Sequence, residues 1–411
     1  MNRIFYIILS AQFFSSLADN ALLFAAIALL KDLNAPAWQT PVLHQFFVFS
    51  FIILAPFVGA FSDALPKGRV MFISNGIKVV GCFAMLMGLH PLLSYGLVGI
   101  GAALYSPAKY GILTEFLPSN RLVWANSWME GLTVGAIILG AIFGGFLIGH
   151  HVEAEVVKQL SELKFNGGID TAPEFAIFVV LILYFVAAII NCYIPKLPIE
   201  HSLSKRTFGF LIVDFWQSFL SLWKDPLGQV SLAVTSLFWG AGTSLRFIII
   251  AWSAVALKFD LEQATQLTAV LAVGLAMGAV VAAKAVPLEN AVKVLPLGIG
   301  MGLVVLSMVW VTDWRISVAL LILDGILAGC FLIPMNALLQ FRGHKLMGSG
   351  HSIAVQNFNE NLSILLMLGA YALMIDAGLS INMIVILFGL FITVTMALLT
   401  KKHTHDQDST N

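Results

Sequence analysis

The sequence predicts an all-α polytopic membrane protein, and three observations support that fold class. Hydrophobic residues make up 59% of the 411 positions and charged residues only 11%, whereas a soluble domain is about a quarter charged. The apolar residues gather in runs of about 20, the length that crosses a bilayer as a helix. Lys+Arg and Asp+Glu both number 22, so there is no basic excess to neutralise phosphates. The composition therefore excludes a soluble enzyme, a disordered chain and a nucleic-acid-binding protein.

Twelve apolar runs are long enough to span the membrane. The first follows Arg3, has no small-residue cleavage site and holds Gln12, Ser16, Asp19 and Asn20 in its apolar core. A cleaved signal peptide would not contain such groups, so we expect a retained span. The expected spans are residues 4–30, 42–62, 70–89, 92–114, 123–149, 174–194, 229–256, 264–286, 291–312, 315–340, 348–375 and 380–400.

Lys and Arg in the connecting segments set the orientation of the spans. With the N-terminus inside, the inner side carries fourteen of these residues and the outer side five, so both termini are expected in the cytoplasm. Three cysteines, Cys82, Cys192 and Cys330, lie far apart in apolar runs and form neither a disulfide framework nor a metal-ligand spacing.

Two connecting segments are long. Residues 150–173 form an acidic outer insert, and residues 196–228 join the sixth and seventh spans on the cytoplasmic side. Within this linker, residues 208–223 are strongly apolar and lie between basic residues, which is typical of an interfacial helix. We therefore divide the chain into an N-terminal six-helix half (1–195), a cytoplasmic linker with an interfacial amphipathic helix (196–228), a C-terminal six-helix half (229–400) and a polar cytoplasmic tail (401–411).

The two halves show a weak internal similarity. Residues 126–130 of the fifth span and 356–360 of the eleventh both end in glutamate, at positions 130 and 360. Asp19 of the first span and Arg246 of the seventh correspond at a similar offset with opposite charge. Twelve spans, a central linker and two related halves are typical of the major facilitator fold, which places its site near the bilayer midplane between pseudo-symmetric halves.

Ionisable side chains inside the spans are the candidate functional residues. A charge at the bilayer centre costs about 2.5–3.5 kcal/mol, so such groups are expected to face one another, water or a ligand. Lys78 in the third span has no polar stripe beside it, and its role is open. The other five are Asp19, Lys109, Glu130, Arg246 and Glu360.

Polar residues at helical spacing accompany four of these charges. We expect the four helices to line a shared polar cavity, and the alternative is a set of buried ion pairs that only fix helix register. The stripes are Gln12, Ser16 and Asp19; Asn126, Glu130 and Thr133; Ser236, Gly240, Thr243 and Arg246; and Ser352, Gln356, Asn359 and Ser363, with Glu360 beside them.

Several segments resemble the bacterial lysophospholipid transporter family of the major facilitator superfamily, and the likeness runs from the first span to the twelfth. The segments are LADNALLFAAIALLK (17–31), YSPAKYGIL (105–113), SLFWGAGTSLRF (236–247), PMNALLQ (334–340) and AVQNFNEN (354–361).

The resemblance implies a monomeric flippase without cofactor or metal in the bacterial inner membrane. It would move lysophosphatidylethanolamine and lysophosphatidylglycerol from the outer to the inner leaflet by alternating access. A partner acyltransferase/acyl-acyl-carrier-protein synthetase would then re-acylate them. The resemblance also implies inward charged side chains at Asp19, Lys109, Arg246 and Glu360. The full expected substrate-binding set is Asp19, Asn20, Lys109, Glu130, Arg246, Gln356 and Glu360.

The loop between the second and third spans carries a further expected set, Asp63, Lys67 and Arg69, with a conformational role. The superfamily pattern there is Gly-x-x-x-Asp-Arg-x-Gly-Arg. Gly59 and Asp63 match it, whereas Ala64 replaces the first arginine and the final Gly-Arg pair arrives two residues late.

The expected mechanism uses a cavity that carries both signs of charge. Arg246 or Lys109 would bind the phosphate, and Asp19, Glu130 or Glu360 would bind an ethanolamine ammonium. The spans that contain Pro107 and Pro334 are the expected bending points.

Two other functions are considered. A proton-coupled exporter of amphiphilic drugs would use Asp19 or Glu130 as proton carrier, but residues 140–145 lack the proline that such antiporters carry in the fifth span. A membrane acyltransferase would use a His-x4-Asp pair, which His403 and Asp408 form. That pair lies in the polar tail, which is typical of a solvated segment.

Overall fold

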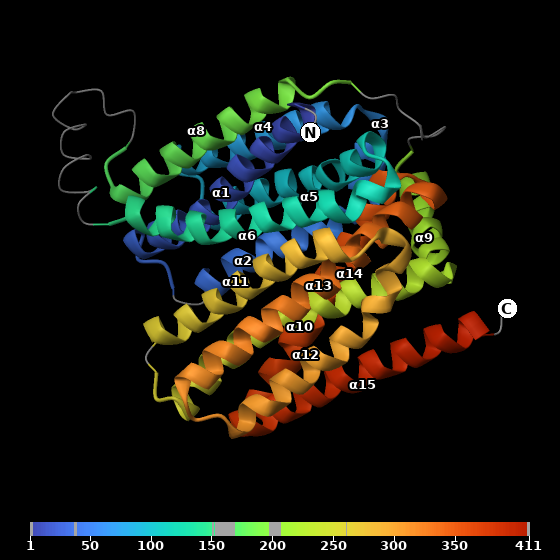
Figure 1. Ribbon diagram of the computed structural model, residues 1–411. Helices are drawn as coiled ribbons and strands as arrows, with labels where there is room; N and C mark the ends of the chain where they lie inside the picture. The colour runs from blue at the N-terminus through green and yellow to red at the C-terminus, as the bar shows by residue number, and fades with distance from the viewer. Residues whose placement is uncertain are drawn as a thin grey trace. The chain divides into compact units, whose positions relative to one another are not determined.

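The computed structural model describes residues 3–36, 39–149, 152, 169–196, 207–259 and 261–408. Helices form almost all of these ranges, and no β-strand occurs among them (Figure 1). A helix occupies each of the twelve ranges that were expected to span the membrane, so the all-α prediction is confirmed. Most of the 150–173 insert and residues 197–206 of the linker lie outside the described residues.

The first six expected spans correspond to seven helices. The second span is a pair, α2 and α3, bent by 66°, and not the continuous helix expected over 42–62. Pro56, in the first turn of α3, lacks the N–H that would continue the ladder of α2, and it restricts the residue before it. The helices are α1 (Arg3–Asp32), α2 (Gln39–Ile53), α3 (Ala55–Ala64), α4 (Lys67–Leu86), α5 (Pro91–Phe116), α6 (Leu122–Leu147) and α8 (Ala172–Cys192).

The second part of the chain begins with the amphipathic helix expected at 208–223, which is present as α9 (Phe208–Lys224). Its exposed large apolar side chains are Phe208, Val213, Trp216 and Leu220. Short 3₁₀ segments at Leu288–Val294 and Met308–Trp310 flank α12. The remaining helices are α10 (Pro226–Ala256), α11 (Leu261–Ala285), α12 (Leu295–Ser307), α13 (Trp314–Met347), α14 (Ser349–Asp376) and α15 (Ile381–Asp408).

The chain is a multi-pass membrane protein by the length and composition of its helices. Within the described ranges, ten helices are long and apolar enough to cross a membrane, and the bent α2–α3 pair makes an eleventh. The one remaining expected span, the fourth (92–114), is α5, a helix of 26 residues that contains Lys109 and Glu115.

The chain forms two compact units, each with its own contacts. Unit 1 comprises Met1–Phe116, Leu132–Ser218 and Met347–Asn357, and unit 2 comprises Leu117–Gly131, Phe219–Leu346 and Phe358–Asn411. The beginning of α14 therefore packs within unit 1, and the beginning of α6 packs within unit 2.

Small residues allow close helix packing inside unit 1. Ala18, Ala21 and Ala25 of α1 are fully buried in an apolar core that also contains Tyr184 of α8. Gly140 of α6 lies so close to α1 that an added Cβ would stand 2.7 Å from Cβ of Asn20. Close approach of this kind is typical of membrane helices, which pack through small residues. It holds the polar stripe of α1 against its neighbours.

Candidate functional site

A buried ion pair joins α4 to α1 in unit 1. The Lys78 side chain is fully buried, and its Nζ donates to Oδ1 and Oδ2 of Asp19 at 2.7 and 2.9 Å. Lys78 Nζ also donates to Oγ of Ser15 at 3.1 Å. The rings of Tyr105 and Tyr184 lie 5.1 and 5.2 Å from the same nitrogen, within cation–π range. The ammonium is therefore compensated on several sides, which a buried charge requires.

The Asp19 carboxylate is less enclosed than its partner. Its side chain is 23% exposed, against 1% for that of Lys78. Tyr184 donates its hydroxyl to Oδ1 at 2.7 Å, so Oδ1 accepts two hydrogen bonds and Oδ2 accepts one. A carboxylate has about four acceptor sites, so Oδ2 keeps capacity for a further donor.

Polar side chains extend this network along α1. Ser15 donates to Oδ1 of Asn75 on α4 at 2.9 Å. Gln12 donates to Ser16 Oγ at 2.7 Å and to Thr133 Oγ1 on α6 at 3.2 Å. The expected stripes of the first and fifth spans therefore meet through Gln12 and Thr133. Asn75 comes three residues before Lys78 on the same face of α4, so a polar stripe does accompany Lys78, contrary to the sequence-based interpretation.

The other expected substrate-binding residues of unit 1 have different surroundings. Asn20 donates its amide to the Ser16 carbonyl on its own helix at 2.8 Å. Lys109 of α5 is buried, and its Nζ lies 4.3 Å from the centre of the Tyr110 ring. Gln356 of α14 is also buried. None of these three is the partner of Asp19, which instead pairs with Lys78, a residue outside the expected substrate-binding set.

The remaining three members belong to unit 2. Glu130 of α6 and Glu360 of α14 are buried, whereas Arg246 of α10 is exposed. One and a half turns before Arg246, Gly240 lies directly against α14, where an added Cβ would stand 2.2 Å from Oγ of Ser363. The expected stripes of the seventh and eleventh spans therefore approach each other inside unit 2.

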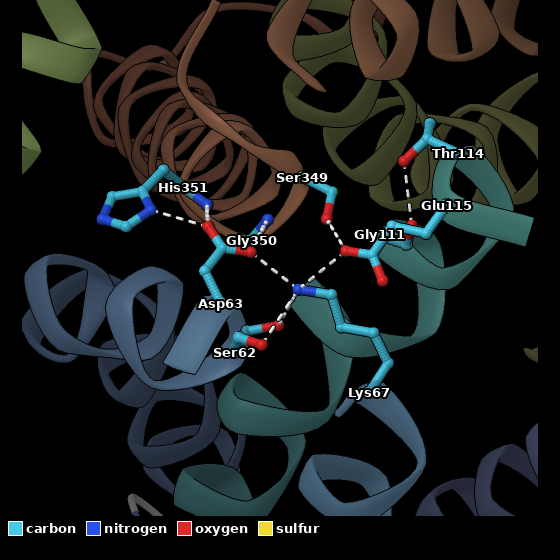
Figure 2. Close-up of polar contacts among 9 residues, drawn as sticks. All are labelled: Ser62, Asp63, Lys67, Gly111, Thr114, Glu115, Ser349, Gly350 and His351. Atoms are coloured by element: carbon cyan, nitrogen blue, oxygen red, sulfur yellow. Dashed lines mark hydrogen bonds and ion pairs between the residues drawn. The ribbon is translucent and has the colours of Figure 1, made fainter. Parts of the chain in front are cut away.

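A second polar centre lies at the N-terminus of α14 and is shown in Figure 2. Asp63, at the end of α3, accepts the backbone N–H of Gly350 on Oδ1 at 2.8 Å and that of His351 on Oδ2 at 3.1 Å. The first N–H groups of a helix have no partner within it and carry the positive end of the helix dipole. Asp63 therefore caps α14 although 287 residues separate it from Gly350.

Lys67 holds the same carboxylate from α4. Its Nζ lies 2.6 Å from Oδ1 of Asp63 and 3.3 Å from Oε1 of Glu115 on α5, and it donates to the Ser62 carbonyl at 2.9 Å. Ser349 donates to the same Glu115 oxygen at 2.7 Å (Figure 2). We refer to Ser62, Asp63, Lys67, Glu115, Ser349, Gly350 and His351 as the Asp63 cluster.

His351 links this cluster to α9. Its Nδ1 lies 2.7 Å from Oδ2 of Asp63, and its Nε2 lies 2.9 Å from Oδ2 of Asp214. A carboxylate beside each ring nitrogen suits the doubly protonated imidazolium, which donates from both nitrogens. Of the expected loop residues, Asp63 and Lys67 are brought together, whereas Arg69 is exposed on α4 and lies outside the cluster.

A further ion pair lies at the N-terminus of α10 in unit 2. Asp225 caps this helix by accepting the Gly228 N–H at 2.8 Å, and Arg342 of α13 donates Nε to the same oxygen at 3.0 Å. The Arg342 Nη2 atom contacts the other oxygen. Burial alone would raise the pKa of Asp225, but the hydrogen bonds from Arg342 and Gly228 outweigh it, and the pKa is lowered.

Comparison with known proteins gives a consistent result. The model of the Major Facilitator Superfamily matches residues 8–368. The protein named "Lysophospholipid transporter LplT" from Klebsiella pneumoniae is 41% identical over 393 residues, which cover 95% of this chain and 94% of that protein. The protein of the same name from Serratia proteamaculans is 42% identical over 374 residues, which cover 91% and 89%.

Solved structures agree on the fold. The major facilitator transporter FucP in the outward conformation has a TM-score of 0.74 at 13% identity and covers 97% of this chain and 98% of that one. A bacterial homologue of the iron transporter ferroportin has a TM-score of 0.71 at 14% identity and covers 98% and 100%. At these identities the likeness concerns the fold alone.

Proposed function

Because this chain belongs to the major facilitator superfamily and, within it, to the lysophospholipid transporter family, we propose that it transports lysophospholipids. The substrates are lysophosphatidylethanolamine and lysophosphatidylglycerol, and they move from the outer to the inner leaflet of the bacterial inner membrane. The observation that carries this proposal is the 41% identity, over 95% of the chain, to a protein named as a lysophospholipid transporter.

The polar residues suit the head group of such a lipid. A phosphate cannot enter hydrocarbon without a partner for its charge. The exposed guanidinium of Arg246 offers a charge-assisted, bidentate contact to the phosphate, with Lys109 as the alternative. Asp19 offers its remaining acceptor capacity on Oδ2 to an ethanolamine ammonium. Lys78 holds the Asp19 carboxylate in place through two hydrogen bonds, so we add Lys78 to the proposed site as a positioning residue. The remaining proposed contacts are Asn20, Glu130, Gln356 and Glu360.

The Asp63 cluster suits the conformational step of alternating access. Asp63 holds the N-terminus of α14 through charge-assisted hydrogen bonds, each worth about 1.5–3 kcal/mol, and Lys67 holds the Asp63 carboxylate. Breaking the bonds from Gly350 and His351 to Asp63 would free the beginning of α14 from α3, and reforming them would hold it again. We place the cluster on the cytoplasmic side, where the excess of Lys and Arg puts both termini.

The product would be a lysophospholipid in the inner leaflet. It lacks one acyl chain, so a reaction that consumes it is an acyl transfer. We assign that step to an acyltransferase/acyl-acyl-carrier-protein synthetase. The transporter works as a monomer beside it.

The test is inward movement of fluorescent lysophosphatidylethanolamine in proteoliposomes. We expect transport by the unmodified protein without an imposed ion gradient and its loss in Arg246→Ala. Arg315→Ala is the matched control, because Arg315 is also exposed but lies at the start of α13 against Trp314. Transport at the unmodified rate by Arg246→Ala would remove the phosphate assignment. Gradient-driven movement of a cationic dye without lipid movement would make the protein a drug exporter.

A further inference from the structure

A small cavity lies inside unit 2 among α10, α11, α12, α13 and α15. Its volume is about 70 Å³, and its lining is hydrocarbon apart from a single carboxyl group, that of Asp324 on α13. Ala328 and Phe331 follow Asp324 at i+4 and i+7 and line the same cavity. Asp324 is not among the candidate residues predicted from the sequence.

The Asp324 side chain is buried without compensation. Its exposure is 2%, and its Oδ1 atom is enclosed with no hydrogen-bond partner in the described part of the chain. Two other aspartates of the helices differ from Asp324. Asp19 is held by Lys78 and Tyr184, and Asp63 is held by Lys67 and the N-terminus of α14.

Helix packing keeps a counter-charge away from this carboxyl. Gly325, the next residue, lies against α11 so closely that an added Cβ would stand 2.4 Å from the Leu271 carbonyl oxygen. Gly329 meets the Leu275 carbonyl in the same way, again at 2.4 Å. Two helices in backbone contact leave no room between them for a long basic side chain. The close contact therefore fixes Asp324 at the wall of an apolar space.

No other titratable or charged side chain lines this cavity from α10, α11, α12, α13 or α15 in the described residues. Arg246 directly follows the lining residue Leu245 on α10, but its side chain is exposed. Tyr371 of α14 packs against the same apolar core without lining the cavity. The carboxyl thus faces hydrocarbon on all five helices.

An ionised carboxyl group inside a membrane span costs about 2.5–3.5 kcal/mol. Three kinds of ligand could neutralise its charge: a metal cation, an organic cation and a proton. A metal cation needs several oxygen ligands, and the lining supplies those of one carboxyl only. A cationic amphiphile needs more space than 70 Å³, a volume that holds a few waters at about 10–15 Å³ each. A proton needs neither additional ligands nor space.

We propose that Asp324 is a proton-binding site in unit 2. The acid is neutral while the cavity is dry, and it releases its proton when the helices around it separate enough to admit water. Transport is then sensitive to pH through a residue that does not touch the substrate. The site is separate from Asp19, whose charge is already matched by Lys78. The inference goes beyond the proposed function and does not depend on which substrate is carried.

The first test is labelling of the full-length protein in detergent by dicyclohexylcarbodiimide, a hydrophobic reagent that adds to protonated carboxyl groups. Peptide mapping by mass spectrometry identifies the labelled residue. We expect label on Asp324 at neutral pH and none on Asp63, which is buried but paired. Labelling should fall about tenfold for each pH unit once the acid is mostly ionised.

Access of a bulky hydrophobic reagent to this position is checked separately with Asp324→Cys and N-cyclohexylmaleimide, a thiol reagent that carries the same cyclohexyl ring. If this cysteine reacts while Asp324 of the unmodified protein resists the carbodiimide at all pH values, the proton-binding proposal is wrong. Protection of Asp324 by tetraphenylphosphonium at constant pH would also overturn it, because the cavity would then bind an organic cation.

The second test is the pH profile of lysophosphatidylethanolamine transport, with equal pH on both sides of the vesicle. We expect the rate of the unmodified protein to change with pH and that of Asp324→Asn, a neutral mimic of the acid, to lose this dependence. An unchanged profile in Asp324→Asn would contradict the role in transport. Absence of transport by the unmodified protein would remove the proposed function, while the labelling result would still decide the proton site.

Discussion

Removing either partner of the Asp19–Lys78 ion pair should destabilise the protein by a different amount. The Lys78 side chain is 1% exposed and that of Asp19 is 23% exposed. Asp19→Asn leaves an uncompensated charge in a fully buried place, which costs about 3–5 kcal/mol. Lys78→Met leaves a carboxylate that still accepts a hydrogen bond from Tyr184 and is only partly buried. We expect a smaller cost for this second change, about 1–3 kcal/mol.

The double variant Asp19→Asn/Lys78→Met removes both charges at once. Replacing a buried ion pair by neutral groups of similar volume is often neutral or stabilising, so the double variant should recover most of the lost stability. It should not recover transport of lysophosphatidylethanolamine, because the acceptor proposed for the ammonium is gone. The assays are thermal unfolding of the detergent-solubilised protein and lipid movement in proteoliposomes.

Two outcomes would refute this reasoning. Equal destabilisation by the two single changes would mean that the difference in burial does not control the energetics. A double variant as unstable as Asp19→Asn alone would mean that Lys78 is not the charge that Asp19 compensates. Asn20→Ala is the control and should change stability little, because in the described part of the chain the Asn20 side chain donates to the Ser16 carbonyl of its own helix.

Two further predictions concern the helix N-termini. Asp63→Asn should slow transport and lower the unfolding temperature, because the charge-assisted hydrogen bonds that cap α14, worth about 1.5–3 kcal/mol each, are lost. The control Arg69→Ala should leave both the transport rate and the unfolding temperature unchanged. A normal transport rate in Asp63→Asn would exclude the conformational role. The pKa of Asp225 is lowered in the folded state from its ordinary value of 3.8, so its contribution to stability is complete above that value and is lost as pH falls through the folded pKa. Arg342→Gln should therefore reduce the loss of thermal stability between neutral pH and acid, and an identical profile would contradict this.

The fold was predictable from length and composition because the bilayer imposes helices of a known length on apolar runs. Each of the twelve expected ranges contains a helix, and the family resemblance is confirmed by the comparisons. The break between α2 and α3 was not predicted, because a proline such as Pro56 is compatible both with a kinked helix and with two helices. The sequence alone does not distinguish these outcomes.

The polar centres were predictable only in part. Asp63 and Lys67 were found because they belong to one short loop pattern. Glu115 and His351, which complete the cluster, come from other helices, and no periodicity connects residues 288 positions apart, as Asp63 and His351 are. For Lys78 a signal existed, because Asn75 lies on the same face of α4, but the partner Asp19 is 59 residues away. The positions within one turn of Asp324 on its helix face are apolar, and the nearest polar residue on that face is Ser317, seven positions away, so no polar stripe indicates Asp324.

Asp19, Asp63 and Asp324 are the same residue type in similar apolar helices, and they differ in what stabilises the charge. Asp19 has a fixed cation of its own, so the pair is complete before any ligand arrives and only a weak additional contact to an ammonium remains. Asp63 has a cation and a helix N-terminus, so its bonds must break if α14 is to move. Asp324 has neither, so its charge state depends on what enters the cavity. The first acid is therefore suited to orient a substrate, the second to hold a conformation and the third to exchange a proton.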